Sequence, residues 1–139
     1  MVNLITGKNG KGKSKFLLEK VNTQVKEILG NIVYLDTSTK HMYELNNKIR
    51  LINVSEYNLS SGDMFIGFLM GIISGDHDIQ QMYFDNFLSL SHTSVADIEA
   101  VVNQLEELSK NFGIDIYAAI STTDGDIPES LKDKVIEAL

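Results

Sequence analysis

Residues 7–14 read Gly7-Lys8-Asn9-Gly10-Lys11-Gly12-Lys13-Ser14 and match the pattern G-x-x-x-x-G-K-[ST] in full. The preceding residues, Val2–Thr6, form a short, mostly apolar run that predicts a β-strand. After the match, apolar side chains recur at the spacing of one helical face, namely Leu17, Val21, Val25 and Ile28. The pattern therefore stands between a predicted strand and a predicted helix, which is the context that a phosphate-binding P-loop (Walker A loop) requires.

Each position of this pattern suits a loop that wraps around a polyphosphate. Gly7, Gly10 and Gly12 allow backbone conformations and close approaches that a Cβ atom would block. The helix after Gly12 would point unpaired backbone N–H groups at the anion. Lys13 would reach the β- and γ-phosphates, and the hydroxyl of Ser14 would be a ligand of Mg²⁺. We therefore expect ATP, or another nucleoside triphosphate, bound together with Mg²⁺.

The other residues of the loop are predicted to contact the nucleotide as well. They are Lys8, Asn9 and Lys11, with Lys15 just beyond the match. Lys8 stands where one class of P-loops carries a second lysine that reaches the phosphate of a partner subunit, although that class has Gly at the position of Asn9. The alternative is that these lysines only raise the local positive potential. A Gly- and Lys-rich surface loop that matches by chance is the alternative for the motif as a whole.

Two later strand ends carry candidate site residues. Met82, Tyr83 and Phe84 form an apolar run that ends at Asp85. In P-loop proteins a central strand brings such an acid to the Mg²⁺ site, so Lys13 and Asp85 are the candidate catalytic residues. Ser121 and Thr122 follow another predicted strand and are candidates for sensing the γ-phosphate. For Asp85 the alternative is a residue that caps a turn, and for Ser121 and Thr122 it is an ordinary turn.

Predicted strands alternate with predicted helices along the chain. Beyond the first strand, strands are expected over 32–35, 49–54, 81–84, 114–120 and 134–139, and helices over 64–74 and 94–112, with a short one after Pro128. This alternation predicts a single domain over residues 1–139, with a mostly parallel sheet in a three-layer α/β/α arrangement. Gly67, Gly71 and Gly75 share one helical face, which would let another backbone approach closely; we expect that helix to pack on the sheet.

Composition and charge narrow the function classes. The 139-residue chain has no Cys, which excludes disulfides, thiolate metal sites and a Cys nucleophile. Its longest nearly unbroken apolar run is well below the roughly 20 residues of a membrane span, and no signal peptide is recognisable, so a cytoplasmic protein is expected. Residues 1–26 hold six lysines against one acid, whereas residues 27–139 hold six basic residues against eighteen acids. One end can attract an anion, but this balance argues against nucleic acid as a partner.

The chain resembles a group of small, uncharacterised bacterial P-loop proteins that are sometimes labelled twitching-motility (PilT) ATPase-like. The likeness spans the whole chain and rests on residues 7–14, 41–45, 49–57 and 65–85. It implies a P-loop NTPase fold with a RecA/ASCE-like core. A looser resemblance to the heads of transporter- and repair-type ATPases rests on Leu59–Asp63, which precedes Asp85 as a signature stretch does in those heads. That resemblance implies a site completed by a second copy of the chain or by a protein partner.

Two features predict weak hydrolysis. Asn86 follows Asp85 where the transporter-type heads have Glu, and an amide cannot act as a general base at neutral pH. The only Arg, Arg50, is predicted on a strand and not on a mobile loop, which does not suit an arginine finger. We therefore expect a slow or partner-dependent Mg-ATPase.

Three alternatives to this ATPase stay open: a nucleotide-gated regulatory module with little hydrolysis, a degenerate ABC-type ATPase head, and a structural domain with a vestigial loop. Asp76, His77 and Asp78 are interpreted as a polar loop and not as a metal site, because no further ligand stands at metal-binding spacing.

Overall fold

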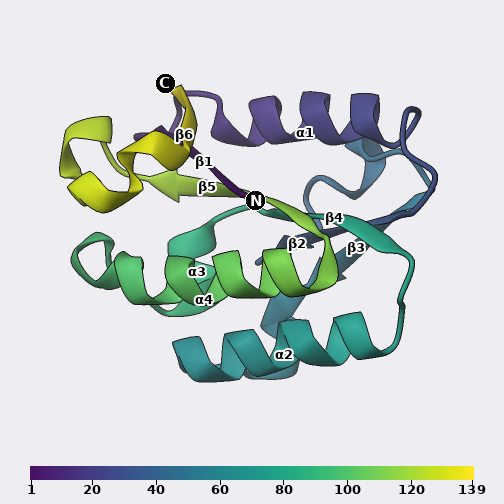
Figure 1. Ribbon diagram of the computed structural model, residues 1–139. Coiled ribbons are helices and arrows are strands. Elements are labelled where there is room, and N and C mark those ends of the chain that lie inside the picture. Colours follow the sequence, from purple (N-terminus) through teal and green to yellow (C-terminus); the bar gives the residue numbers. More distant parts are fainter.

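A computed structural model describes residues 1–139, except for the side chain of Asp124. The chain forms one six-stranded sheet in which neighbouring strands pair in parallel. The strand order is β3-β2-β4-β5-β1-β6 (Figure 1). The strands are β1 (Val2–Gly7), β2 (Asn31–Asp36), β3 (Ile49–Asn53), β4 (Ile79–Phe84), β5 (Asp115–Ser121) and β6 (Val135–Ala138).

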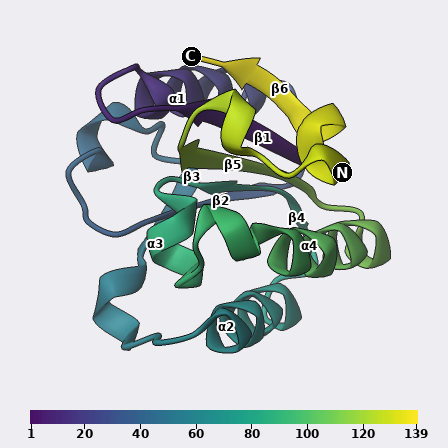
Figure 2. The ribbon, with the colours of Figure 1, turned by 90° about the vertical axis from the view of Figure 1, so that its left-hand side faces the viewer.

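Helices cover both faces of the sheet (Figure 2). Helix α1 (Lys13–Gln24) covers one face, and α2 (Gly62–Ser74), α3 (Phe87–Ser91) and α4 (Ile98–Phe112) cover the opposite face. Short 3₁₀ turns occupy Met42–Glu44, Val54–Tyr57, Val95–Asp97, Asp124–Asp126 and Glu129–Lys134. This arrangement confirms the predicted α/β fold with a parallel sheet between two helical layers.

The strands are buried on both faces, which is why their sequences are nearly continuous apolar runs. Along β2, Val33 and Leu35 point into the core beneath α2, α3 and α4, whereas Ile32 and Tyr34 point into the core beneath α1. This alternation follows from the two-residue repeat of a strand. On the α1 side three buried tyrosines from neighbouring strands stack in a row: the ring centroids of Tyr34 and Tyr83 lie 6.2 Å apart, and those of Tyr83 and Tyr117 lie 4.7 Å apart.

The strand order places β5 between β1 and β4. Because parallel strands all point the same way, the loops that follow β1, β4 and β5 emerge at one edge of the sheet. Gly7, at the end of β1, pairs with Ser121 at the end of β5, and Asp85 follows β4 directly. The fold therefore gathers the loop of residues 7–14, Asp85 and Ser121 at the carboxyl edge of the sheet, where ligands bind in open α/β folds.

Three local features differ from the sequence-based expectations. Helix α3 was not predicted; Asn86 adopts a left-handed conformation (φ 58°, ψ 51°) that turns the chain from β4 straight into it. Strand β4 begins at Ile79, two residues earlier than expected. Helix α1 ends at Gln24, although Val25 and Ile28 beyond it still pack against the core on that face, so the apolar spacing identified the buried side chains and missed the helix end.

The glycine face of α2 points away from the protein core. Gly67 and Gly71 are exposed, and a Cβ atom built on either would meet no atom within 4 Å. Phe65, Leu69 and Ile73 on the other side of α2 are the side chains that enter the core. The expectation that α2 packs on the sheet is confirmed, but within this fold its glycines do not serve a close backbone approach. No helix in the described part of the chain combines the length and apolar character needed to cross a bilayer.

Candidate functional site

The loop between β1 and α1 turns through two glycines that have positive φ angles. Gly10 and Gly12 have φ values of 83° and 96°, which residues with a Cβ rarely adopt. Gly12 is the N-cap of α1 and has no side chain to cap it, so the first N–H groups of the helix remain available to a ligand. Gly7 is needed for space and not for its φ angle. A Cβ at this position would lie 3.1 Å from Cβ of Leu139 and 3.3 Å from Cγ of Lys13.

Lys13, the first residue of α1, is folded back over the loop. Its Nζ donates a hydrogen bond to the carbonyl oxygen of Lys8 at 3.0 Å, and the residue is only 9% exposed. Burial lowers the pKa of the Lys13 ammonium, while Asp85 raises it in part. A buried ammonium held only by a neutral carbonyl and a nearby acid favours the arrival of an anion, because the anion would compensate the charge.

Ser14 and Asp85 are in contact although they lie far apart in the sequence. The Oγ of Ser14 donates to Oδ1 of Asp85 at 3.1 Å, and the hydroxyl of Tyr34 donates to Oδ2 at 3.0 Å. Asp85 is 2% exposed. Burial and the neighbouring Asp85 carboxylate raise the pKa of Tyr34, so this phenol stays protonated and keeps donating. The structure thus brings together the hydroxyl and the carboxylate that the sequence assigned to a Mg²⁺ site.

A cavity of about 470 Å³ opens in front of this pair. Its lining residues are Asn9, Gly10, Gly12, Lys13, Ser14, Lys15, Lys40, Asp85 and Asn86. Lys8 and Lys11 are exposed and are not among its lining residues. Lys40, from the loop after β2, adds a positive charge that no sequence motif indicated. The cavity thus has both basic groups and a buried acid in its lining, a combination that suits an anion bound together with a metal ion.

Two residues of this edge escaped the sequence analysis. Asp36, at the end of β2, is fully buried; its Oδ1 accepts a hydrogen bond from the backbone N–H of Thr37 at 2.6 Å, while its Oδ2 has no partner among the described residues. Burial and then the charge of Asp85 raise the pKa of Asp36. His41 lies close enough that side-chain ligand atoms of Asp36, His41 and Asp85 are all within 4.8 Å of one another. Asp36 had a signal, an acid directly after an apolar strand, but His41 had none.

Of the other residues that the sequence analysis singled out, Asn86, Ser121 and Thr122 lie at the carboxyl edge of the sheet near the loop of residues 7–14, whereas Arg50 does not. The Nδ2 of Asn86 donates to Oδ1 of Asp36 and to Oγ1 of Thr37, both at 3.4 Å. Ser121 lies opposite Gly7, and the N–H of Thr122 donates to the Gly7 carbonyl at 3.1 Å, which places both beside the start of the loop. Arg50 lies on the edge strand β3, which three other strands separate from β1, and is not among the residues lining the cavity.

The stretches with weaker functional signals have structural roles. In the loop before β4, Asp76 accepts hydrogen bonds from the side chain of Asn31 at 2.9 Å and the backbone of Asp78 at 2.9 Å, as expected for a polar loop. Ser61, within the signature-like stretch 59–63, is the N-cap of α2 and accepts from the N–H of Met64 at 3.1 Å.

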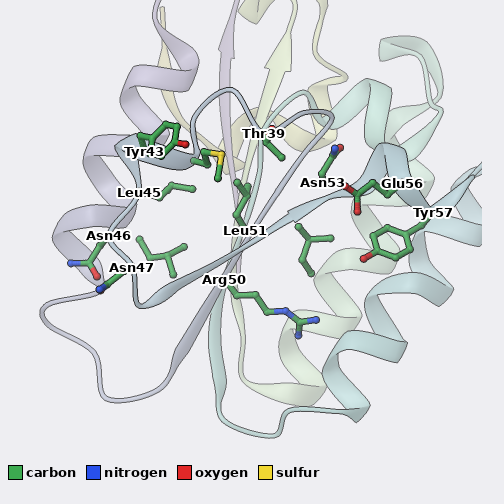
Figure 3. Close-up of a pocket in the computed structure, with 13 residues that line it drawn as sticks. Thr39, Tyr43, Leu45, Asn46, Asn47, Arg50, Leu51, Asn53, Glu56 and Tyr57 are labelled. Carbon is green, nitrogen blue, oxygen red and sulfur yellow. The ribbon is translucent and has the colours of Figure 1, made fainter.

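A larger cavity, of about 600 Å³, lies at the β3 edge of the sheet (Figure 3). Thr39, Leu45, Leu51 and Tyr57 are among its lining residues, and Arg50 extends from the same strand. Neither the loop of residues 7–14 nor a buried acid lines this cavity, and its aromatic lining residues Tyr43 and Tyr57 are largely exposed. The smaller cavity at the loop of residues 7–14 is the stronger candidate for the functional site, because the buried charges of Lys13 and Asp85 line it.

Comparison with solved structures supports the fold. The flagellar accessory protein FlaH from Methanocaldococcus jannaschii aligns with a TM-score of 0.58 at 16% sequence identity, over 98% of this chain and 70% of FlaH. In all, 87 solved chains match, so the fold alone does not single out one activity. No known protein family and no curated protein matches the sequence. The resemblance to the twitching-motility ATPase-like group thus finds no support, and the agreement with FlaH concerns architecture.

Proposed function

We propose that this protein binds a nucleoside triphosphate, ATP by preference, with Mg²⁺ at the loop of residues 7–14, and hydrolyses it slowly or only with a partner. The observation that carries the proposal is the 3.1 Å contact between Ser14 and Asp85, which the fold creates from two motifs 71 residues apart. A chance match to the loop pattern would not place an acid from a central strand against the one hydroxyl that the pattern specifies.

The proposed roles follow from the geometry. Backbone N–H groups of the glycine turn and of the α1 N-terminus surround the phosphates, and Lys13 exchanges its bond to the Lys8 carbonyl for phosphate oxygens. Ser14 and Asp85 hold Mg²⁺ and its water shell, which supplies charge neutralisation at the β- and γ-phosphates. Lys15 and Lys40 on the rim raise the positive potential around the entrance.

Slow turnover follows from what surrounds the expected γ-phosphate position. Asn86 is held by Asp36 and Thr37, and its amide cannot take a proton from water. The carboxylate nearest to it, Asp36, is the group at this edge that could orient water, but no Arg of the chain lines the cavity to stabilise the transferred charge. A partner that supplies an Arg would raise the rate.

Thermal unfolding with a nucleotide panel tests the binding. ATP, ADP, GTP and GDP, each with Mg²⁺, are compared on wild type, Lys13→Ala and the control Lys26→Ala, which removes an exposed lysine beyond the end of α1. At 100 times its Kd a ligand stabilises the native state by about 2.7 kcal/mol. Wild type and Lys26→Ala should gain this stability and Lys13→Ala should lose nearly all of it. Equal shifts in all three proteins, or none in wild type, would contradict the proposal.

A nucleotide-gated module that scarcely hydrolyses is the second candidate, favoured by Asn86 and by the placement of Arg50. ATP turnover of wild type and Lys13→Ala distinguishes the two. Equal, near-zero rates combined with ATP binding by wild type would support the module, whereas a wild-type rate that Lys13→Ala abolishes supports the ATPase. Turnover of tens per second by the isolated wild type would show that Asn86 does not limit the reaction. The transporter-head alternative instead requires ATP-dependent dimerisation, which light scattering with and without ATP would detect.

A further inference from the structure

Three side chains from separate segments converge beside the proposed phosphate site. Strands β2 and β4 are neighbours, with Leu35 opposite Phe84, so the residues that follow at their carboxyl ends, Asp36 and Asp85, are brought together. His41 reaches the same place from the loop between β2 and β3. One ligand atom from each of the three lies within 4.8 Å of the other two.

Two side-chain atoms of these three residues have no hydrogen-bond partner among the described residues. Oδ2 of Asp36 and Nε2 of His41 are both buried and unpaired. Asp36 is 0% exposed, so bulk water does not compensate its carboxylate either. Leaving a buried acceptor unpaired costs about 1–3 kcal/mol, and more when the acceptor is charged. Two such atoms in one cluster with the carboxylate of Asp85 point to a cation that is bound between the three residues.

The imidazole of His41 is oriented by a carboxylate on its Nδ1 side. Its Nδ1 lies 2.9 Å from Oε1 of Glu44. An ionised carboxylate only accepts hydrogen bonds, so Nδ1 is the donor in this contact and Nε2 is the ring nitrogen left for a ligand. A carboxylate behind a histidine in this way fixes the ring and strengthens it as a ligand. Asp85 is fixed comparably by the hydroxyls of Ser14 and Tyr34.

We propose that Asp36 Oδ2, His41 Nε2 and a carboxylate oxygen of Asp85 bind a divalent transition-metal ion such as Zn²⁺ or Co²⁺. The imidazole nitrogen selects against Mg²⁺, which is coordinated by oxygen, so this ion is distinct from the Mg²⁺ of the nucleotide. With metal–ligand bonds of about 2.1 Å, the ligand atoms around a tetrahedral ion lie about 3.4 Å apart. The three atoms lie within 4.8 Å of one another, so each pair would close by at most about 1.4 Å through side-chain rotation when the ion binds. Three protein ligands leave a coordination position for water.

The metal site does not depend on the proposed nucleotide function, since none of its ligands requires a phosphate. It does share Asp36 with the proposed water-orienting role and Asp85 with the proposed Mg²⁺ site, so the transition metal would compete with that water and with Mg²⁺ for these two carboxylates. The competing explanation of the cluster is a protonated His41 that pairs with Asp36 and binds no metal. The two explanations differ in a single measurable quantity, the stoichiometry of transition-metal binding without nucleotide.

Calorimetric titration of the untagged, metal-stripped protein with Zn²⁺, in the absence of nucleotide, tests the proposal. One ion per chain is expected for wild type, and the same titration with Co²⁺ should give visible absorption bands typical of an ion with a nitrogen ligand. His41→Ala should weaken Zn²⁺ binding about 100-fold and abolish the Co²⁺ bands. His77→Ala is the matched control, because it removes an exposed histidine from the loop before β4 and should behave as wild type.

A second variant keeps the test decisive if His41→Ala does not fold, which circular dichroism would reveal. Glu44→Gln preserves an acceptor for Nδ1–H but removes the charge, and should weaken Zn²⁺ about 10-fold without changing the stoichiometry. The proposal is overturned if wild type binds no Zn²⁺, or if wild type, His41→Ala and Glu44→Gln bind it equally. Such a failure would leave the Lys13→Ala result untouched, because no nucleotide takes part in this titration.

Discussion

Asp36 shows how a single buried residue can lower the stability of a fold while serving its site. Burial and the charge of Asp85 raise its pKa, so the native state holds the ionised form of Asp36 less well than the unfolded chain does. The corresponding loss of stability is present at neutral pH. It disappears as the pH falls through the raised native pKa and Asp36 becomes protonated.

Substituting Asp36→Asn should therefore stabilise the metal-free, nucleotide-free protein. The amide oxygen can still accept from the N–H of Thr37, and a buried charge is removed. We expect a gain of about 1 kcal/mol in the free energy of unfolding at pH 7, measured by urea denaturation. The gain should shrink as the pH is lowered towards 4, because wild-type Asp36 then becomes neutral as well. A variant less stable than wild type at pH 7 would show that the ionised form is stabilised by something other than its visible partners.

At the scale of elements, the glycines of this chain have opposite roles. Gly30 joins the end of the α1 region to β2, and a Cβ there would lie 2.4 Å from the carbonyl oxygen of Asp78. That carbonyl cannot move away freely, because it accepts the backbone hydrogen bond from Asn31 at 2.8 Å. Gly67 on α2, in contrast, has open space around it and a helical backbone.

Two alanine substitutions should accordingly shift stability in opposite directions. Gly30→Ala should lower the free energy of unfolding by about 2 kcal/mol through the clash with Asp78. Gly67→Ala should raise it by about 0.5–1 kcal/mol, since Ala has the higher helix propensity and meets no neighbour. Thermal melts of both variants beside wild type provide the measurement. A destabilised Gly67→Ala would indicate that the glycine face of α2 is covered in solution.

At the scale of the whole molecule, Glu106 links three elements. From α4 its Oε2 accepts from the backbone N–H of Val2, at the start of β1, and from Nζ of Lys134, next to β6, both at 3.0 Å. Burial alone would raise the pKa of Glu106, but these hydrogen bonds and the nearby positive charges outweigh it and lower the pKa. The ionised Glu106 side chain therefore stabilises the native state at pH values above the ordinary pKa of glutamate. This stabilisation is lost as the pH falls through the lowered native pKa.

Glu106→Gln should remove this pH-dependent contribution. Glu106 is about one-third exposed, so solvent screening limits the expected loss to about 0.5–1 kcal/mol at pH 7. Urea denaturation at pH 7 and pH 3 measures it, and the difference from wild type should nearly vanish at the lower pH. A difference that is equal at both pH values would assign the loss to packing, not to charge.

Most of the fold could be predicted from the sequence, because the glycine turn before α1 and the apolar runs of the strands are both local patterns. Gly12 and Lys13 mark the turn into α1, and apolar runs such as Ile32–Leu35 mark buried parallel strands. Helix α3 escaped because only five residues form it and no apolar repeat fits in so short a length. The site was half readable: Lys13, Ser14 and Asp85 follow from motifs, and the structure brings them together. Asp36 meets Asp85 only through the pairing of β2 with β4, and His41 reaches them from the loop after β2; no local sequence pattern encodes either contact.

The last strand has a practical consequence for anyone who handles this protein. Leu139 donates its N–H to the carbonyl oxygen of Thr6 at 2.8 Å, and its side chain lies against Gly7. Met1 lies at the opposite end of β1, where its amino group donates to Ser109. A polyhistidine tag fused after Leu139 would thus lie beside the glycine turn, where it could block ligand access or bind metal ions. The same tag fused before Met1 would leave the cavity at the glycine turn open.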